Sequence, residues 1–153
     1  MILVLLTLLH VQNPTLKSDY GIASSYWPGD GMCGKQRADG KPFTASDNHI
    51  AHRWLPLGKK VWVKNLRTER WAKTTVRDRG PFGFCLYKSN GCPQHPKKLS
   101  RGRRCPEGYK WVVRTRRRKG ECGYYRGIAD LTLPVARRIG ATQMTPIRLW
   151  WRK

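Results

Sequence analysis

The sequence is poor in acidic residues and has no apolar run of membrane-spanning length. Nine Asp and Glu residues stand against 31 Lys and Arg residues, which gives a formal net charge of +22 and a pI near 10.6. Such a cationic surface attracts polyanions, so nucleic acid, an anionic bacterial envelope and a membrane surface are all candidate partners. Charge alone does not distinguish among these three.

The apolar run at residues 2–9 is shorter than the roughly 20 residues that a spanning helix needs. It fits the hydrophobic part of a secretory signal, although no basic residue precedes it and no clear cleavage site follows it. The alternative is an N-terminal strand or helix that packs on the domain. We assign residues 1–19 as an N-terminal apolar segment, a candidate signal or anchor.

The five cysteines include no C-x-x-C pair, which argues against a structural zinc site. Neither a metal nor another cofactor is expected. Cys85, Cys92, Cys105 and Cys122 follow one another, and two disulfides among them would suit an exported protein. Sequence does not choose among the possible connectivities. Cys33, far upstream, can instead pair with one of the four, and either way one cysteine is left over.

Most of the predicted elements are strands. A polar turn between two strand-like runs predicts a hairpin. The order of elements, mostly strands with one helix and no internal repeat, favours a small β-barrel or sandwich over a βαβ fold. The predicted strands are Tyr20–Trp27, Val61–Leu66, Trp71–Arg77, Lys110–Thr115 and Ile147–Trp151.

The helix signal lies between Gly127 and Gly140. Thr132 can cap a helix, Pro134 belongs in a first turn, and Gly140 can adopt the left-handed conformation that ends a helix. This segment therefore predicts the one convincing helix of the chain.

Residues 84–125 interrupt the pattern of the core. They hold four of the five cysteines and dense basic clusters at residues 101–104 and 114–119. Their aromatic residues and cysteines can anchor them, so we interpret them as an insertion in a domain of residues 20–153 rather than as a linker. We expect the insertion to carry much of the binding to polyanions, which should weaken steeply with salt.

An imidazole and a carboxylate lie at opposite ends of the predicted hairpin unit. His52 precedes the first strand, and Asp78 ends the second strand in the sequence D-R-G-P. A hairpin of this length can bring its ends together, and a His/Asp pair is a usable acid–base site.

Several motifs, in their order along the chain, resemble the rare lipoprotein A family. These septal lytic transglycosylases have a double-psi β-barrel similar to that of expansins and barwin. The resemblance covers about residues 20–83 and 126–151 and leaves the insertion outside. The matching stretches are GIASSY at 21–26, IAH at 50–52 followed by LPLG at 55–58, VKNL at 63–66, VRDRGPF at 76–82 and IADLT at 128–132.

The resemblance implies a mostly β, six-stranded double-psi β-barrel with one or two short helices. It also implies cleavage of the β-1,4 bond of peptidoglycan that leaves a 1,6-anhydro end. A hydrolase needs two carboxyl groups. In a lytic transglycosylase the substrate's own C6 hydroxyl is the nucleophile, so one acid/base group can serve both steps of the reaction. Asp78 and His52 match the family's aspartate and histidine, and we expect them to face each other across an open groove as the catalytic pair.

Other residues are expected near this site. Substrate binding is assigned to five residues: Tyr26, Thr44, Asp47, Trp54 and Arg79. Aromatic faces such as that of Trp54 can stack on sugars. Asp130 is assigned a structural role through hydrogen bonds to the backbone at the helix entry.

The chain departs from the family where acidic residues usually precede the histidine. Lys41 and Thr44 stand at those positions, with Asp39 and Asp47 on either side as possible replacements. Glycan binding without cleavage, as in expansin-like proteins, is therefore the main alternative.

A nucleic-acid-binding protein is a third hypothesis, but no helix-turn-helix, zinc-finger or RNP pattern supports it, so any such binding would be non-specific. The expected partners are peptidoglycan strands and anionic envelope polymers. The expected location is exported, in the periplasm, the envelope or the medium, with a virion-borne protein as a variant of the same chemistry. The oligomeric state is left open.

Overall fold

The computed structural model describes residues 15–26, 29–44, 46–87, 105, 107–114 and 124–153 of the chain. The apolar run at residues 2–9, Cys92, Cys122 and most of the basic clusters at 101–104 and 114–119 lie outside the described residues. Predictions made for them stay predictions.

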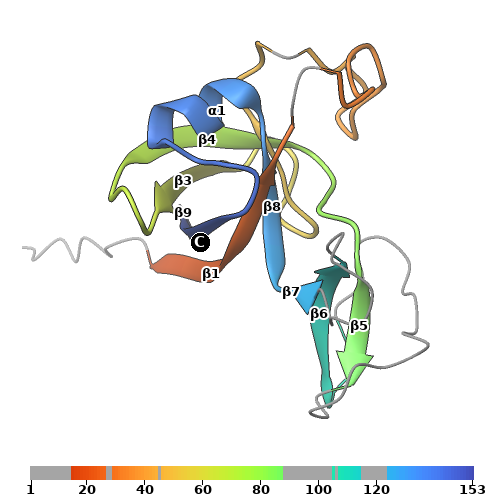
Figure 1. Cartoon of the computed structure of the whole chain (residues 1–153), viewed down its shortest axis with the longest axis vertical. Helices are drawn as coiled ribbons and strands as arrows, with labels where there is room; N and C mark the ends of the chain where they lie inside the picture. Colours follow the sequence, from red (N-terminus) through yellow and green to blue (C-terminus); the bar gives the residue numbers. More distant parts are fainter. Residues whose placement is uncertain (1–14, 27–28, 45, 88–104, 106, 115–123) are drawn as a thin grey trace, which may run out of the picture.

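Six strands close into a barrel, which confirms the predicted fold class (Figure 1). Two pairs, β1 with β8 and β2 with β4, are parallel, and the other neighbours are antiparallel. The first strand begins earlier than the predicted Tyr20. In barrel order the strands are β1 (Leu16–Ser25), β8 (Gly127–Leu131), β2 (Ile50–Ala51), β4 (Trp71–Asp78), β3 (Lys60–Asn65) and β9 (Thr145–Arg152).

The barrel core forms because apolar side chains alternate with polar ones along the strands. In β9 every second residue from Thr145 onward is buried, and β3 alternates in the same way. Removing these apolar side chains from water is the main force that stabilises the fold. The fully buried apolar residues include Ile50, Val61, Val63, Val76, Leu131, Ile139, Ile147 and Leu149.

The single described helix, α1 (Leu133–Ile139), begins and ends where the sequence predicts. Gly140 adopts the left-handed conformation at its C-terminus, with φ 63°. Thr132 occupies the cap position, but its hydroxyl makes no cap hydrogen bond and instead donates to the carbonyl oxygen of His49 at 2.8 Å. Residues 127–131 of the predicted helix segment form β8, because Ala129 and Leu131 are needed in the barrel core.

The insertion contributes a second, three-stranded sheet of β5 (Phe84–Tyr87), β6 (Tyr109–Arg114) and β7 (Tyr124–Tyr125), which extends from one side of the barrel (Figure 1). Only β6 was expected from the sequence. The Arg53 guanidinium lies 3.9 Å from the centre of the Trp111 ring, so the insertion contacts the barrel at this stacked pair. No helix in the described part of the chain is long and apolar enough to span a membrane.

The cysteines are only partly described. Cys33 is a free, exposed thiol, which leaves the alternative that it pairs with a later cysteine without support. Cys105 is disulfide-bonded. The pairing predicted within the insertion otherwise falls outside the described side chains.

Candidate functional site

Two aspartates lie in one row across three barrel strands. Ala51 of β2 is paired with Asp78 of the parallel strand β4 on one side and with Asp130 of β8 on the other. Ser24 of β1 is in turn the register partner of Asp130. Since neighbouring strands lie about 4.8 Å apart, the backbones of the two aspartates are separated by roughly 10 Å. The topology thus places two carboxyl groups at one end of the barrel.

Asp130 has an environment that favours its protonated form. Its Oδ1 accepts a hydrogen bond from the Ser24 hydroxyl. Burial raises the pKa of Asp130 from 3.8 to about 6; the Ser24 hydrogen bond opposes this rise, and the charge of Asp78 adds to it. A Cβ atom at Gly80 would lie 2.4 Å from Oδ2, so only glycine lets the chain after Asp78 approach this carboxyl. No backbone hydrogen bond to its carboxyl is among its described contacts, so the structural role expected for Asp130 is not the role that its surroundings indicate.

Asp78 joins β4 to the loop that precedes the site. Its Oδ1 accepts hydrogen bonds from the amides of Ala38, at 2.9 Å, and Arg79, at 2.8 Å. The Ala38 bond holds the loop of residues 37–41 against the end of β4. Asp78 therefore orders the rim of the site with one oxygen.

Tyr26 follows β1 and belongs to the same cluster. Its amide donates to the carbonyl oxygen of Leu131 at 2.9 Å, and its ring lies 4.8 Å from that of Phe43. The pKa of Tyr26 lies well above its usual value because of burial and the nearby charges of Asp130 and Asp78. Its phenol therefore stays protonated close to both carboxyl groups, and the substrate-binding role expected from the sequence stays a prediction.

The sequence predicted that His52 faces an open groove, but the structure buries it. It is only 1% exposed, and its Nδ1 accepts hydrogen bonds from the amides of Trp54 and Leu55. Burial, followed by the charges of Arg53 and Arg79, lowers the pKa of His52 to about 3. A neutral, buried imidazole of this kind shapes the 52–55 turn. It reaches Asp78 through the backbone, since the His52 amide donates to the Asp78 carbonyl oxygen at 3.1 Å.

Arg79 supports the same turn. Its Nη1 donates to the carbonyl oxygens of His52, at 3.1 Å, and Leu55, at 2.7 Å. The side chain thus points toward the 52–55 turn, and its guanidinium is occupied by backbone contacts. The substrate-binding role predicted for Arg79 has no described contact in its favour.

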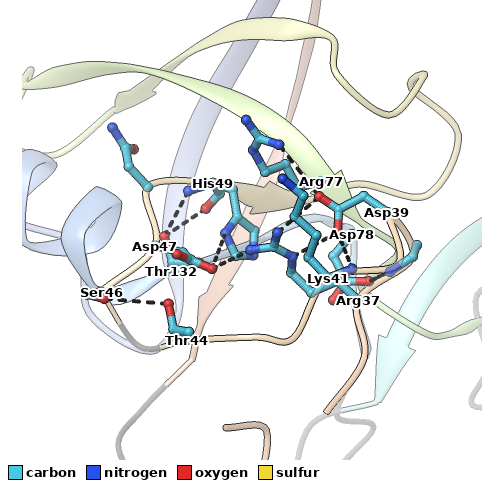
Figure 2. Close-up of polar contacts among 12 residues, drawn as sticks. Arg37, Asp39, Lys41, Thr44, Ser46, Asp47, His49, Arg77, Asp78 and Thr132 are labelled. Carbon is cyan, nitrogen blue, oxygen red and sulfur yellow. Dashed lines mark hydrogen bonds and ion pairs between the residues drawn. The ribbon is translucent and has the colours of Figure 1, made fainter. Parts of the chain in front are cut away.

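A buried arginine holds the two aspartates that flank the missing acidic positions. Arg37, 6% exposed, bonds both oxygens of Asp39 at 3.0 and 3.1 Å and also forms an ion pair with Asp47 (Figure 2). Arg77 lies 3.6 Å from the second Asp39 oxygen. Burial raises the pKa of Asp39, but contacts with Arg37, Lys41 and Arg77 more than offset it, so the pKa lies below 3.8.

The remaining predicted residues lie around this ion cluster. For Asp47, too, burial raises the pKa while Thr44 and Arg37 lower it, and the net shift is downward. Thr44 is exposed, and its hydroxyl lies 3.5 Å from that of Ser46. Asp39 and Asp47 therefore stay charged and bound to Arg37, which leaves Asp130 as the carboxyl suited to proton transfer.

Sequence reasoning missed His49. It is fully buried, lies edge-on to Phe43 and has its Nδ1 3.9 Å from the Asp47 carboxylate. Burial and the charge of Arg37 lower the pKa of His49 to about 4, against the opposite effect of Asp47. Its backbone exchanges hydrogen bonds with the Thr132 hydroxyl. No motif marked this histidine: Phe43 and Asp47 are near it in the sequence, but its burial and its hydrogen bonds with Thr132 depend on the folded barrel.

Trp54 lies beside the site and next to the insertion. It is 38% exposed and packs edge-on against His52 and Trp151, with ring centres 4.9 and 5.5 Å away. It also lines a cavity of about 30 Å³ together with Arg53 and Trp111. This cavity has room for water but is far smaller than the roughly 300–1,000 Å³ of typical small-molecule sites.

The arrangement can perform acid–base chemistry with two carboxyl groups of different character. One is partly buried with a raised pKa, and the other is negatively charged and hydrogen-bonded to amides, a combination typical of acid–base pairs. The described residues contain no cluster of three or more His, Cys, Asp or Glu side chains placed to hold a metal ion.

The fold and the site define a double-psi β-barrel with a carboxyl pair at one end. No protein-family model matches the chain. The chain is 45% identical over 62 residues to the probable endolytic peptidoglycan transglycosylase RlpA of Nostoc sp., a match covering 40% of this chain and 17% of that protein. It is 39% identical over 62 residues to the endolytic peptidoglycan transglycosylase RlpA of Campylobacter jejuni, covering 40% of this chain and 22% of the relative. The domain is therefore an RlpA-like double-psi β-barrel, and the chain spans about a fifth of the length of these relatives.

Proposed function

We propose that this barrel cleaves peptidoglycan glycan strands by a lytic transglycosylase-type reaction at Asp130 and Asp78. The observation that carries the proposal is the raised pKa of Asp130 beside the charged Asp78, in a barrel whose relatives are named peptidoglycan transglycosylases. A pKa near 6 suits a group that must both give and take a proton near neutral pH.

The reaction needs one such group. Protonated Asp130 gives its proton to the glycosidic oxygen as the bond from that oxygen to C1 breaks. The C6 hydroxyl of the same sugar attacks C1, closes the 1,6-anhydro ring and gives its proton to the Asp130 carboxylate. Atoms and protons balance without water, and Asp130 returns to its starting state.

The neighbouring residues have supporting roles. The negative charge of Asp78 keeps the pKa of Asp130 high and favours the positive charge that develops on the sugar ring. The Tyr26 phenol is a hydrogen-bond donor for a sugar oxygen near both carboxyl groups. His52 and Arg79 act as positioning residues, because they hold the turn that borders β2 and the end of β4.

Glycan binding without cleavage is the second candidate. The observation in its favour is that Lys41 and Thr44 occupy the family's acidic positions, while Asp39 and Asp47 are held by Arg37. If the reaction needs a further free carboxylate in this loop, the barrel can hold a glycan strand but not break it.

An exported location follows from the same proposal, because peptidoglycan lies outside the cytoplasm. Disulfides within the insertion belong to this proposal, since an oxidising compartment allows them to form. Peptidoglycan strands and anionic polymers of the envelope are the partners, and contacts with nucleic acid are non-specific.

The test is incubation of the purified chain with peptidoglycan and mass spectrometry of the released products. We expect anhydro ends from the wild type, none from Asp130→Asn, and wild-type rates from the control Asp19→Asn, whose carboxylate pairs with Arg126 away from the row. Because Asp130 must be protonated, kcat/KM should fall about tenfold per pH unit well above pH 6. Asp78→Asn should move this pH limit lower, since removing a nearby negative charge lowers the pKa of Asp130.

Two results would overturn the assignment. Cleavage by Asp130→Asn at the wild-type rate would remove Asp130 from the chemistry. Binding of glycan strands with no products from the wild type at any pH between about 4 and 8 would establish the non-catalytic alternative.

A further inference from the structure

The outer face of the barrel carries a dense set of cations between aromatic rings. This outer face comprises the outward-pointing side chains of β3, β4 and β9, on strands that alternate between buried and exposed positions. Glu69, in the turn after β3, forms an ion pair with one of its lysines, Lys64. The residues of this outer face that the proposal uses are Lys60, Trp62 and Lys64 of β3, Lys73 of β4, and Arg148, Trp150 and Arg152 of β9.

Two tryptophans at the centre of this outer face hold the cations in place. Trp62 and Trp150 are register partners, with ring centres 6.4 Å apart and planes within 8° of parallel. Lys73 and Arg152 lie over the Trp62 ring, at 5.7 and 6.0 Å from its centre. Arg148 lies 5.9 Å from the centre of the Trp150 ring and also contacts Tyr20. These cation–π contacts fix long side chains that would otherwise move freely in solvent.

Two hollows repeat the same chemistry on either side of the tryptophan pair. One has a volume of about 310 Å³ and is lined by Trp62 with four cations, Lys59, Lys60, Lys73 and Arg152. The other has a volume of about 280 Å³ and is lined by Trp150, Leu16, Ser18 and three cations, Lys17, Lys64 and Arg148. Each hollow is near the lower end of the size range of small-molecule sites. Each hollow thus combines one tryptophan with several cations. A polymer whose repeating unit carries one sugar ring and one negative charge could place one unit in each hollow.

We propose that the outer face of the barrel binds an anionic glycan, a polysaccharide with phosphate or carboxylate groups at regular intervals. Its negative groups would contact the cations held over Trp62 and Trp150, and its sugar units would occupy the two hollows. The acidic pair at Asp130 has the opposite charge, so the two sites select different ligands. This second site does not depend on the cleavage of peptidoglycan.

Single-stranded nucleic acid fits the outer face less well. Proteins that bind it without sequence preference stack bases on open aromatic faces. Here Lys73 and Arg152 lie over Trp62, and Arg148 lies over Trp150, so a base would have to displace them. The anionic groups of a glycan can instead bind these cations without displacing them from the tryptophan rings.

The test compares two double variants that lose the same charge. Arg148→Gln/Arg152→Gln removes two cations of the outer face, and Arg137→Gln/Arg138→Gln removes two exposed cations of α1. Binding of the full chain to wall teichoic acid and to polygalacturonate is measured from about 0.05 to 0.5 M salt, with neutral dextran and single-stranded DNA as comparisons. Circular dichroism and a thermal melt confirm that both variants are folded.

We expect the outer-face variant to lose roughly tenfold in affinity for at least one of the two anionic glycans at physiological salt. The slope of log affinity against log salt should fall by about 1.4, or about 0.7 for each lost contact. The α1 variant should stay within about twofold of the wild type. Trp150→Ala should weaken binding of the same glycan without any change in net charge.

Equal losses in the two double variants would overturn the proposal, because net charge alone would then account for binding. Tighter binding of single-stranded DNA than of either glycan, lost in the outer-face variant, would overturn the assigned partner. Release of anhydro products from peptidoglycan stripped of anionic polymers should be unchanged in the outer-face variant. Failure of the second site and failure of the proposed cleavage are therefore distinguishable.

Discussion

Replacing Asp130 with Asn should make the protein more stable above pH 6. Ionising this carboxyl in the folded state is unfavourable because burial and the charge of Asp78 raise its pKa from 3.8 to about 6. The wild type keeps its full stability below pH 3.8, where Asp130 is protonated in both states, and loses stability as the pH rises through about 6. This shift corresponds to about 3 kcal/mol. Asn has no charge to bury, and its side-chain oxygen can still accept the hydrogen bond from Ser24.

The assay is thermal and urea unfolding of wild type and Asp130→Asn at pH 7.5 and at pH 3.5. At pH 7.5 the variant should be more stable by up to about 3 kcal/mol, or roughly 6–12 °C in Tm for a chain of this size. At pH 3.5 the difference should vanish. Asp39→Asn is a control of opposite sign, because the pKa of Asp39 lies below 3.8. That control should lose stability at pH 7.5 and lose less at pH 3.5.

The reasoning is refuted if Asp130→Asn is no more stable than the wild type at pH 7.5 while Asp39→Asn behaves as expected. Equal stabilisation at both pH values would show that the gain comes from packing rather than from ionisation. A stabilised but inactive Asp130→Asn protein would indicate that catalytic need, rather than stability, keeps an acid at this position.

Two further predictions concern other parts of the chain. Asn65→Ala should destabilise the protein by roughly 1–3 kcal/mol, since the buried Asn65 side-chain amide donates to the carbonyl oxygens of Ile139 and Gly140 at 3.0 and 3.1 Å. An unchanged urea midpoint would show that water replaces these bonds. In native protein Cys33 should react with a thiol reagent at once, whereas Cys105 should react only after reduction; mass mapping of the labelled peptides checks both, and prompt labelling of Cys105 would contradict its disulfide.

Local patterns predicted most of the barrel elements, because each of these depends on near neighbours, but they did not predict β2 or β8. The 3.6-residue spacing of Val135, Ala136 and Ile139 with Gly140 behind them is enough for a short helix, and the helix is there. The hairpin of β3 and β4 likewise follows from alternation on both sides of a polar turn. Residues 127–131, which precede the predicted cap Thr132, were not recognised as the strand β8, because five residues alone do not reveal that they run parallel to β1.

The site was predicted less completely than the fold. The motif around Asp78 predicted a site at the end of β4, but the burial of His52 depends on how the 52–55 turn folds over it. Asp130 was assigned to hydrogen bonds with the backbone at the helix entry, because it lies just before the predicted helix. Its pKa is raised by burial in the closed barrel and further by the charge of Asp78, while the hydrogen bond from Ser24, 106 residues away in the sequence, opposes the rise.

The sequence by itself determined the alternation of strands, the ends of the helix, the excess of positive charge and the motifs that mark a double-psi barrel. These properties are set by residue types and by short-range geometry. Tertiary structure alone decided which carboxyl has a raised pKa, which histidines are buried and which cations lie over tryptophan rings. Each of these depends on desolvation and on charges from strands that are distant in the chain, and both terms exist only once the barrel has closed.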